Sequence, residues 1–166
     1  ETSTGALSDA AALAALARAH DCLVIADTVT SIGGVPFEMD AWQIDAVYSG
    51  TQKCLSVPPG LSPVSFSAKA MEAVRARSAP VQSWFSDLSL LDGYWSEGAK
   101  RAYHHTAPIN ALYGLHEGLV MLHEEGLEAA WERRPRRQEA PPGQADPRRL
   151  SNRRSNWEGL SASPRT

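Results

Sequence analysis

The sequence predicts an α/β fold with a parallel sheet, and two features of its hydrophobic pattern favour this class. Short apolar runs stop abruptly at polar residues, as Cys22–Ala26 does before Asp27, which is typical of strands covered on both faces. Between and after these runs, apolar residues recur at three- and four-residue spacing, which indicates helices. The chain has 166 residues, 43% of them hydrophobic, and can form a core of one-domain size. We therefore expect one α/β domain over residues 1–132.

Most of the chain divides into elements with recognisable ends. Ser8 or Asp9 can cap a first helix, and Gly126 is expected to end a later one. The segment 80–101 is rich in Trp, Tyr, Ser and Gly and predicts only a mixture of loop and short helix. The expected elements are, in chain order, a helix from the cap to about His20, strands at 22–26, 46–49 and around 63–67, and helices at 68–77, 109–125 and from Leu127 onward.

The last of these helices meets a proline. Pro135 lies where the helix interior would be, and proline there costs about 3 kcal/mol because it lacks an N–H and its ring clashes with the preceding turn. We therefore expect this helix not to continue normally past that residue.

Residues 133–166 differ in composition from the rest. They hold nine arginines, five prolines and three acidic residues, whereas residues 1–132 hold 16 acidic and 7 basic residues. Such a segment cannot bury enough apolar surface to offset its ordering entropy, so we expect a disordered tail. It is either a basic tail that binds nucleic acid or another anion, or sequence read out of frame. The second origin is favoured, because the composition changes in mid-helix rather than at a linker.

Neither a membrane segment nor a secretory signal is expected. The longest fully apolar run, Cys22–Ala26, is far shorter than the roughly 20 residues that span a bilayer. Cys22 and Cys54 form no CxxC pattern, which suits a reduced compartment, so we expect a cytoplasmic protein. The start at Glu1, with no basic stretch before an apolar run, is interpreted as a fragment boundary.

Two candidate catalytic residues follow neighbouring strands. Asp27 comes directly after the first expected strand, and Lys53 lies just beyond the second. In open α/β sheets, the loops beyond the carboxyl ends of the strands converge on the ligand site, so one acid and one amine could meet there. Each residue has an ordinary alternative, since a lone aspartate at a strand end is more often a cap or turn residue and a lone lysine more often a solvated surface group.

The sequence around these two residues resembles that of a known family. The stretches concerned are DTVTSIGG at 27–34, YSGTQKCL at 48–55 and PPG at 58–60, with STG at 3–5 and YHHTAP at 103–108 in the expected order. Together they resemble the class V aminotransferases of fold type I, and among these the alanine:glyoxylate and serine:pyruvate aminotransferases. The resemblance covers about residues 1–132. It implies an incomplete large domain with a mostly parallel sheet, helices on both faces and bound pyridoxal 5'-phosphate.

The resemblance implies a chemical role for two residues. Lys53 would be the Schiff-base lysine that holds the cofactor, and once freed it would be the base that moves a proton between the substrate Cα and the cofactor C4′. Asp27 would keep the pyridine nitrogen protonated, so that the ring accepts the electrons left at Cα. The implied reaction is transamination between a small amino acid, alanine or serine, and a small 2-oxo acid, glyoxylate or pyruvate.

By the same resemblance, five further residues would contact the cofactor. Val29 would pack on the ring, Thr2 would lie near the ring hydroxyl, and Gln52 would help to hold the phosphate. Tyr103 and Thr106 would reach the phosphate of the neighbouring subunit, which implies a homodimer with active sites at its interface. For each residue, a satisfied core or turn position is the ordinary alternative.

Three other interpretations stand beside this one. His104 and His105 could suggest a metal, but adjacent side chains point in different directions and rarely chelate one ion, so no metal is expected. Another class V enzyme, such as a cysteine desulfurase or a lyase, is the second, although desulfurases usually have histidine where this chain has Gln52. The third is a catalytically inactive truncated product, because the family's upstream phosphate loop and its carboxylate-binding arginine find no match here.

Overall fold

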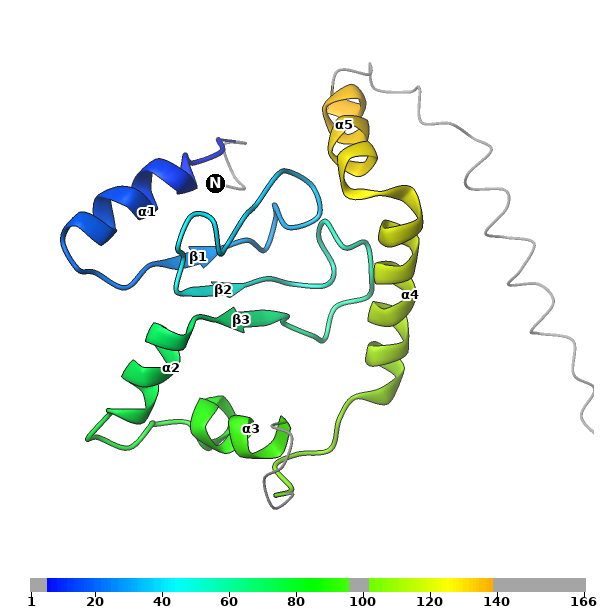
Figure 1. Cartoon of the computed structure of the whole chain (residues 1–166). Helices are drawn as coiled ribbons and strands as arrows, with labels where there is room; N and C mark the ends of the chain where they lie inside the picture. Colours follow the sequence, from blue (N-terminus) through cyan, green and yellow to red (C-terminus); the bar gives the residue numbers. More distant parts are fainter. Residues whose placement is uncertain (1–5, 96–101, 139–166) are drawn as a thin grey trace, which may run out of the picture. The chain divides into compact units, whose positions relative to one another are not determined.

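A computed structural model describes residues 6–95 and 102–138 (Figure 1). The chain divides into two units, Glu1–Trp131 and Glu132–Thr166. Thr2 and most of the predicted tail lie outside the described residues. The predicted domain boundary after residue 132 stays a prediction.

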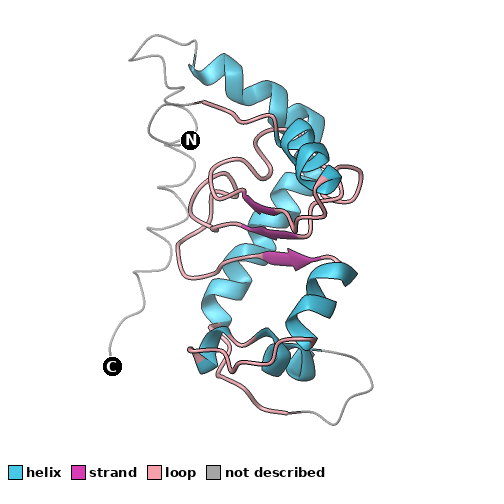
Figure 2. Ribbon diagram, turned by 90° about the vertical axis from the view of Figure 1, so that its left-hand side faces the viewer, coloured by secondary structure: helices cyan, strands magenta, loops and turns pink. Residues whose placement is uncertain are grey.

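A three-stranded sheet forms the centre of the first unit. β1 (Ile25–Asp27) pairs in parallel with β2 (Ala46–Tyr48), and β2 pairs antiparallel with β3 (Val64–Phe66). Figure 2 shows the three strands side by side in one layer. The parallel register sets Asp27 opposite Tyr48, so β1 and β2 deliver their carboxyl ends to the same edge of the sheet.

The first strand is shorter and more exposed than the sequence predicted. We expected a strand over 22–26 covered on both faces, whereas β1 begins at Ile25, whose exposed fraction is 70%. One reason lies at Val24, because its N–H donates to the side chain of Asp45 rather than to a strand. The described elements also leave the face at Ile25 uncovered, so the expectation of burial on both faces is wrong.

Two of the predicted helices are confirmed, the first with one of its two predicted caps. α1 (Ala10–Ala19) begins after Asp9, whose carboxylate accepts a hydrogen bond from the N–H of Ala12 at 2.9 Å. α2 (Ala68–Arg75) begins after Ser67, whose hydroxyl oxygen accepts from the N–H of Ala70 at 3.1 Å. These side chains satisfy N–H groups that a helix start leaves without a partner.

The segment with mixed composition contains two short helices. They are η1 (Trp84–Ser86), a 3₁₀ helix, and α3 (Leu88–Trp95). α4 (Ile109–Glu125) has the predicted bounds and ends at Gly126, whose φ of 84° is a conformation that glycine adopts without strain.

The helix that contains Pro135 continues further than predicted. α5 spans Leu127–Gln138, so the expectation that it could not continue normally past Pro135 is wrong. Proline removes one backbone hydrogen bond and carries a finite cost, and a helix can pass through it with a kink.

α4 lies against the loops that follow β1 and β2, on the side to which these strands point (Figure 1). Two of its glycines allow this approach. A Cβ at Gly118 would lie 2.5 Å from the side chain of Val57, and one at Gly114 would lie 3.3 Å from it. Leu55 and Val57 are both buried, so the α4 contact fixes the loop that carries Lys53.

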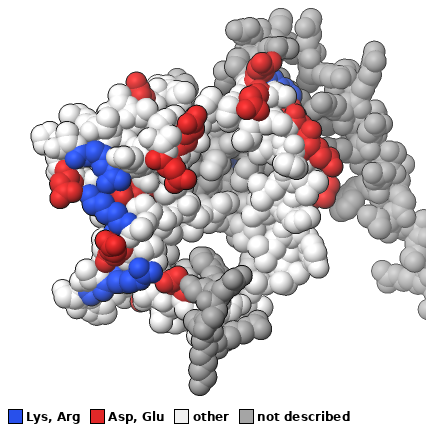
Figure 3. Space-filling model, in the orientation of Figure 1, with Lys and Arg blue, Asp and Glu red and all other residues white. Residues whose placement is uncertain are grey.

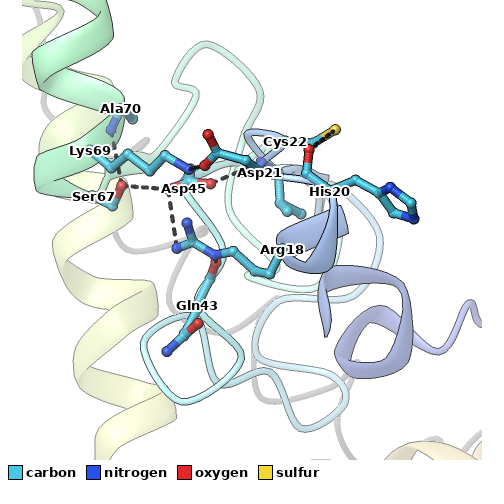
Figure 4. A network of polar contacts seen from close by, with 10 residues as sticks. Arg18, His20, Asp21, Cys22, Gln43, Asp45, Ser67, Lys69 and Ala70 are labelled. Carbon is cyan, nitrogen blue, oxygen red and sulfur yellow. Dashed lines mark hydrogen bonds and ion pairs between the residues drawn. The ribbon is translucent and has the colours of Figure 1, made fainter. Parts of the chain in front are cut away.

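Asp45 ties the other end of the sheet together (Figure 4). Its side chain is 1% exposed and accepts hydrogen bonds from the N–H of Val24 and the hydroxyl of Ser67, both at 2.9 Å. Arg18 of α1 adds an ion pair at 3.4 Å. Burial by itself would raise the pKa of the Asp45 carboxyl, but these hydrogen bonds and the nearby positive charges outweigh it and lower the pKa below its ordinary value of 3.8.

Charge is unevenly distributed over the visible face of the molecule (Figure 3). Basic side chains gather over the part that contains α1 and α2, whereas α4 carries acidic residues and no lysine or arginine. Within the described residues, no helix is both long enough and apolar enough to cross a membrane.

Candidate active site

Asp27 is held in place by two hydrogen-bond donors. Its Oδ1 accepts from the N–H of Val29 at 2.9 Å, and its Oδ2 accepts from the phenol of Tyr48 at 2.8 Å. The carboxylate is nevertheless exposed at the end of β1. It therefore keeps a fixed direction while it stays open to a ligand, since each carboxylate oxygen has capacity for a further donor.

Lys53 lies in a tight loop that backbone hydrogen bonds between nearby residues close. The N–H of Val57 donates to the carbonyl of Thr51 at 3.0 Å, and the N–H of Ser56 donates to the carbonyl of Lys53 at 3.0 Å. Thr51 is fully buried, and its hydroxyl donates to the carbonyl of Pro58 at 2.8 Å. Lys53 is exposed, and its amine forms no ion pair with any side chain that the structure describes.

Hydrogen bonds join the loop after β1 to the loop after β2. The hydroxyl of Ser49 donates to the carbonyl of Thr28 at 3.1 Å, and both residues are almost completely buried. The thiol of Cys54 donates to the carbonyl of Thr30 at 3.0 Å. The loops that carry Asp27 and Lys53 therefore form one connected edge of the sheet.

The side chains of Val29 and Gln52 both lie close to Gly50. A Cβ on Gly50 would be 3.0 Å from the side-chain oxygen of Gln52 and 3.5 Å from the side chain of Val29. Two further predicted residues thus belong to the same group as the loops after β1 and β2.

Tyr103 and Thr106 pair with each other on a separate segment. Their hydroxyl oxygens are 2.6 Å apart, and both side chains are exposed. This segment precedes α4 and makes no hydrogen bond to Asp27 or Lys53 within the described residues. The two residues were predicted to act on a neighbouring subunit, and that stays a prediction.

Tyr48 also belongs to this site, although no role was predicted for it. Its contact with Asp27 depends on the strand register, which pairs the two positions across β1 and β2. The hydrogen bond to Asp27 raises the pKa of the Tyr48 phenol above its ordinary value of 10.0, with smaller contributions from burial and from the carboxylate charge. The sequence feature that could have indicated this contact is a tyrosine at the end of one strand and an acid at the end of the neighbouring strand.

An open depression of about 440 Å³ lies elsewhere. It is lined by Pro59, Gly60 and residues 108–111 at the start of α4, and none of the predicted cofactor residues contributes to it. Among the described residues, no three His, Cys, Asp or Glu side chains come together as metal ligands do.

Comparisons with known proteins show the family to which the chain belongs. A model of the aminotransferase class-V family matches residues 1–141. The chain is 42% identical over 134 residues to the alanine–glyoxylate aminotransferase of Oryctolagus cuniculus, covering 80% of this chain and 34% of that protein. It is 39% identical over 151 residues to the (S)-ureidoglycine–glyoxylate transaminase of Bacillus subtilis, covering 80% and 36%.

Solved structures give the same result. The crystal structure of an alanine–glyoxylate aminotransferase from Nostoc sp. superposes with a TM-score of 0.76 at 45% identity, over 80% of this chain and 35% of that one. The chain therefore belongs to the aminotransferase class-V family and has the α/β fold of the fold type I enzymes, which use pyridoxal 5'-phosphate.

The matches also give the extent of the likeness. The family match ends at residue 141, nine residues beyond the point at which we expected the resemblance to stop. The chain spans about a third of the length of the relatives that it matches.

Proposed function

We propose that the protein to which this chain belongs is a pyridoxal-phosphate-dependent aminotransferase, in which Lys53 is the Schiff-base lysine and Asp27 the partner of the pyridine nitrogen. The observation that carries the proposal is the connected pair of loops, which present an exposed carboxylate and an exposed amine from neighbouring strand ends. When bound, the cofactor supplies an electron sink for the carbanion that forms at the substrate Cα.

Asp27 suits its proposed task because its orientation is already fixed. The donors at Val29 and Tyr48 stabilise the ionised carboxylate, and an ionised carboxylate favours a protonated ring nitrogen beside it. Val29 would pack on the ring, Gln52 would help to hold the phosphate, and Thr2 would lie near the ring hydroxyl.

Lys53 suits its task because its side chain is exposed while the buried residues of its loop keep the backbone in place. Buried Thr51 and the contact of Val57 with α4 limit the motion of the backbone, while the amine stays accessible. After the substrate amine replaces it, Lys53 would carry the proton from the substrate Cα to the cofactor C4′.

The names of the relatives support a small-substrate reaction. Two of them are transaminases of glyoxylate, with alanine and (S)-ureidoglycine as the other substrates. We infer that the whole protein exchanges an amino group between alanine or serine and glyoxylate or pyruvate. Cysteine desulfurases and lyases have no comparable support among these names.

We also propose that the protein acts as a cytoplasmic homodimer. The pair Tyr103 and Thr106 would then contact the phosphate in the neighbouring subunit's site. Its exposed hydroxyl groups are suited to a phosphate, because each can donate a hydrogen bond to an anionic oxygen.

A cofactor titration tests the proposal. The chain is mixed with pyridoxal 5'-phosphate and the absorbance of the bound cofactor is followed for wild type, Lys53→Ala and Lys69→Ala, the last being a lysine that pairs with Asp21 on the surface. We expect the signal to disappear only in Lys53→Ala. An unchanged signal in that variant would exclude Lys53 from the proposed role.

A further inference from the structure

The proposed function leaves two adjacent histidines unexplained. His104 is 6% exposed and stacks on Trp84, with ring centroids 4.1 Å apart and ring planes 8° from parallel. Its Nε2 lies 3.2 Å from the carbonyl oxygen of Trp84, and its Nδ1 lies 2.8 Å from Nδ1 of His105. Both nitrogens of this buried ring are therefore engaged.

These contacts determine where the protons lie. The carbonyl of Trp84 only accepts, so Nε2 of His104 must carry a hydrogen. A neutral His104 then has a lone pair at Nδ1, and the short contact requires His105 to donate from its own Nδ1. The two rings thus adopt opposite tautomers.

The pair tolerates one added proton but not two. A first proton on Nε2 of His105 leaves both hydrogen bonds in place and makes the His105 donor charged, which strengthens its bond. A second proton would fall on Nδ1 of His104, where it would face the N–H of His105. Two donors would then oppose each other, and the contact would open.

The pair is placed to organise the residues on either side of it. Tyr103 and Thr106 flank the two histidines, and their hydroxyl oxygens meet at 2.6 Å. His104 is the buried member of this segment, so it anchors the segment to η1. The rings of Phe85 and Tyr94 lie against His105, and Tyr94 also contacts Tyr103; the two tyrosines are the titratable groups among these residues.

We infer that His104 and His105 form a hydrogen-bonded anchor that positions Tyr103 and Thr106 side by side, and that this anchor opens when both imidazoles are protonated. The histidines are positioning residues, since they act through the two hydroxyl groups. That these hydroxyl groups serve a cofactor phosphate rests on the proposed function; the anchor itself does not.

Nuclear magnetic resonance of the whole chain, labelled with ¹⁵N at histidine, tests the anchor directly. At about pH 8, above the ordinary titration range of imidazole, we expect His104 protonated at Nε2 and His105 at Nδ1, while exposed His116 shows the usual tautomer mixture. A contact between the side chains of Tyr103 and Thr106 should be seen in the same sample and should vanish in acid. Identical tautomers at positions 104 and 105 would overturn the inference.

Two substitutions at position 105 distinguish a positioning role of the hydrogen bond from a general effect on the stability of the fold. His105→Asn keeps a donor for neutral His104, and its amide oxygen can accept from protonated His104 once the amide turns, so the contact of Tyr103 with Thr106 should persist into acid. His105→Ala removes the donor and should lose the contact at every pH, while His116→Ala should leave it unchanged. Equal behaviour of the Asn and Ala variants would refute a role for the hydrogen bond.

Cofactor binding then distinguishes the anchor from the proposed function. If the wild-type chain binds pyridoxal 5'-phosphate, His105→Ala should weaken binding several-fold and His105→Asn should restore it. If the wild-type chain binds none, this chain alone does not form the proposed cofactor site, while the tautomers and the contact of Tyr103 with Thr106 still decide the anchor.

Discussion

At position 27, both carboxylate oxygens have a hydrogen-bond donor before any ligand arrives. One donor is the backbone of Val29, which any residue at that position would supply, and the other is the side chain of Tyr48. Only the second can be removed by substitution. Tyr48 therefore offers the most direct access to the state of the Asp27 carboxylate.

The first prediction concerns the titration of Tyr48. Because its neutral phenol donates to Asp27, its pKa is raised above 10.0; the bond thus contributes to stability below that pH, and the contribution is lost as the pH rises through the folded-state pKa. Asp27→Asn should return the pKa of Tyr48 toward its ordinary value. Ultraviolet titration of tyrosine against Tyr48→Phe isolates this residue, and an unchanged curve in Asp27→Asn would contradict the hydrogen bond.

Single residues were predictable where the local sequence was enough. Asp27 and Lys53 stood at strand ends, and Val29 and Gln52 followed from the family resemblance. The contact of Tyr48 with Asp27 was not predictable in this way, because it depends on the register between two strands whose paired residues are 21 positions apart. The opposite tautomers of His104 and His105 depend likewise on the carbonyl of Trp84, which is distant in sequence.

At the scale of elements, the loop of Lys53 is positioned by the close approach of α4. Gly118 makes this approach feasible, because its missing side chain accommodates Val57. Gly93 on α3 is the matched control, since a Cβ there would meet nothing within 4 Å.

We predict that Gly118→Ala destabilises the protein by about 1–3 kcal/mol, because the new methyl group would overlap the side chain of Val57 and press on the carbonyl of Leu55. Gly93→Ala should instead stabilise it by about 0.5–1 kcal/mol through helix propensity. Urea denaturation measures both. Adding Val57→Ala should recover part of the loss, and equal effects of the two glycine substitutions would contradict the packing.

The Asp45 network gives a prediction with a pH window. The lowered pKa of Asp45 means that its hydrogen bonds contribute fully above the unfolded-state value near 3.8 and are lost as the pH falls through the folded-state pKa. Asp45→Asn should cost about 2–3 kcal/mol at pH 7, the contribution of hydrogen bonds to a charged group. Denaturation at pH 7 and in acid should show a difference from wild type that shrinks in acid; exposed Asp40→Asn is the control.

Elements were predictable where caps and periodicity determine them. Asp9 and Gly126 marked the ends of α1 and α4 correctly, whereas α2 was predicted without its cap, Ser67. The start of β1 was not predictable, because it depends on a side-chain hydrogen bond from a residue 21 positions away. The continuation of α5 past Pro135 was not predicted, because the energetic cost of a proline in a helix was taken to end the helix.

The whole molecule exposes much apolar surface. Side chains such as Ile25, Leu16 and Tyr113 are 60–73% exposed, and the chain spans about a third of the length of its relatives. Exposed apolar side chains favour association where they form a patch. We therefore predict that the chain dimerises or associates further in sedimentation experiments; a monomer at every concentration would contradict the proposed homodimer interface.

The central claim is that Lys53 and Asp27 face one cofactor, and the chain allows a direct test because it has only three lysines, Lys53, Lys69 and Lys100. Borohydride reduction fixes pyridoxal 5'-phosphate on whichever amine holds it, and peptide mass spectrometry then identifies that amine. We predict that the label lies on Lys53 and falls sharply in Asp27→Asn. A label spread evenly over the three lysines, or unaffected by Asp27→Asn, would contradict the account.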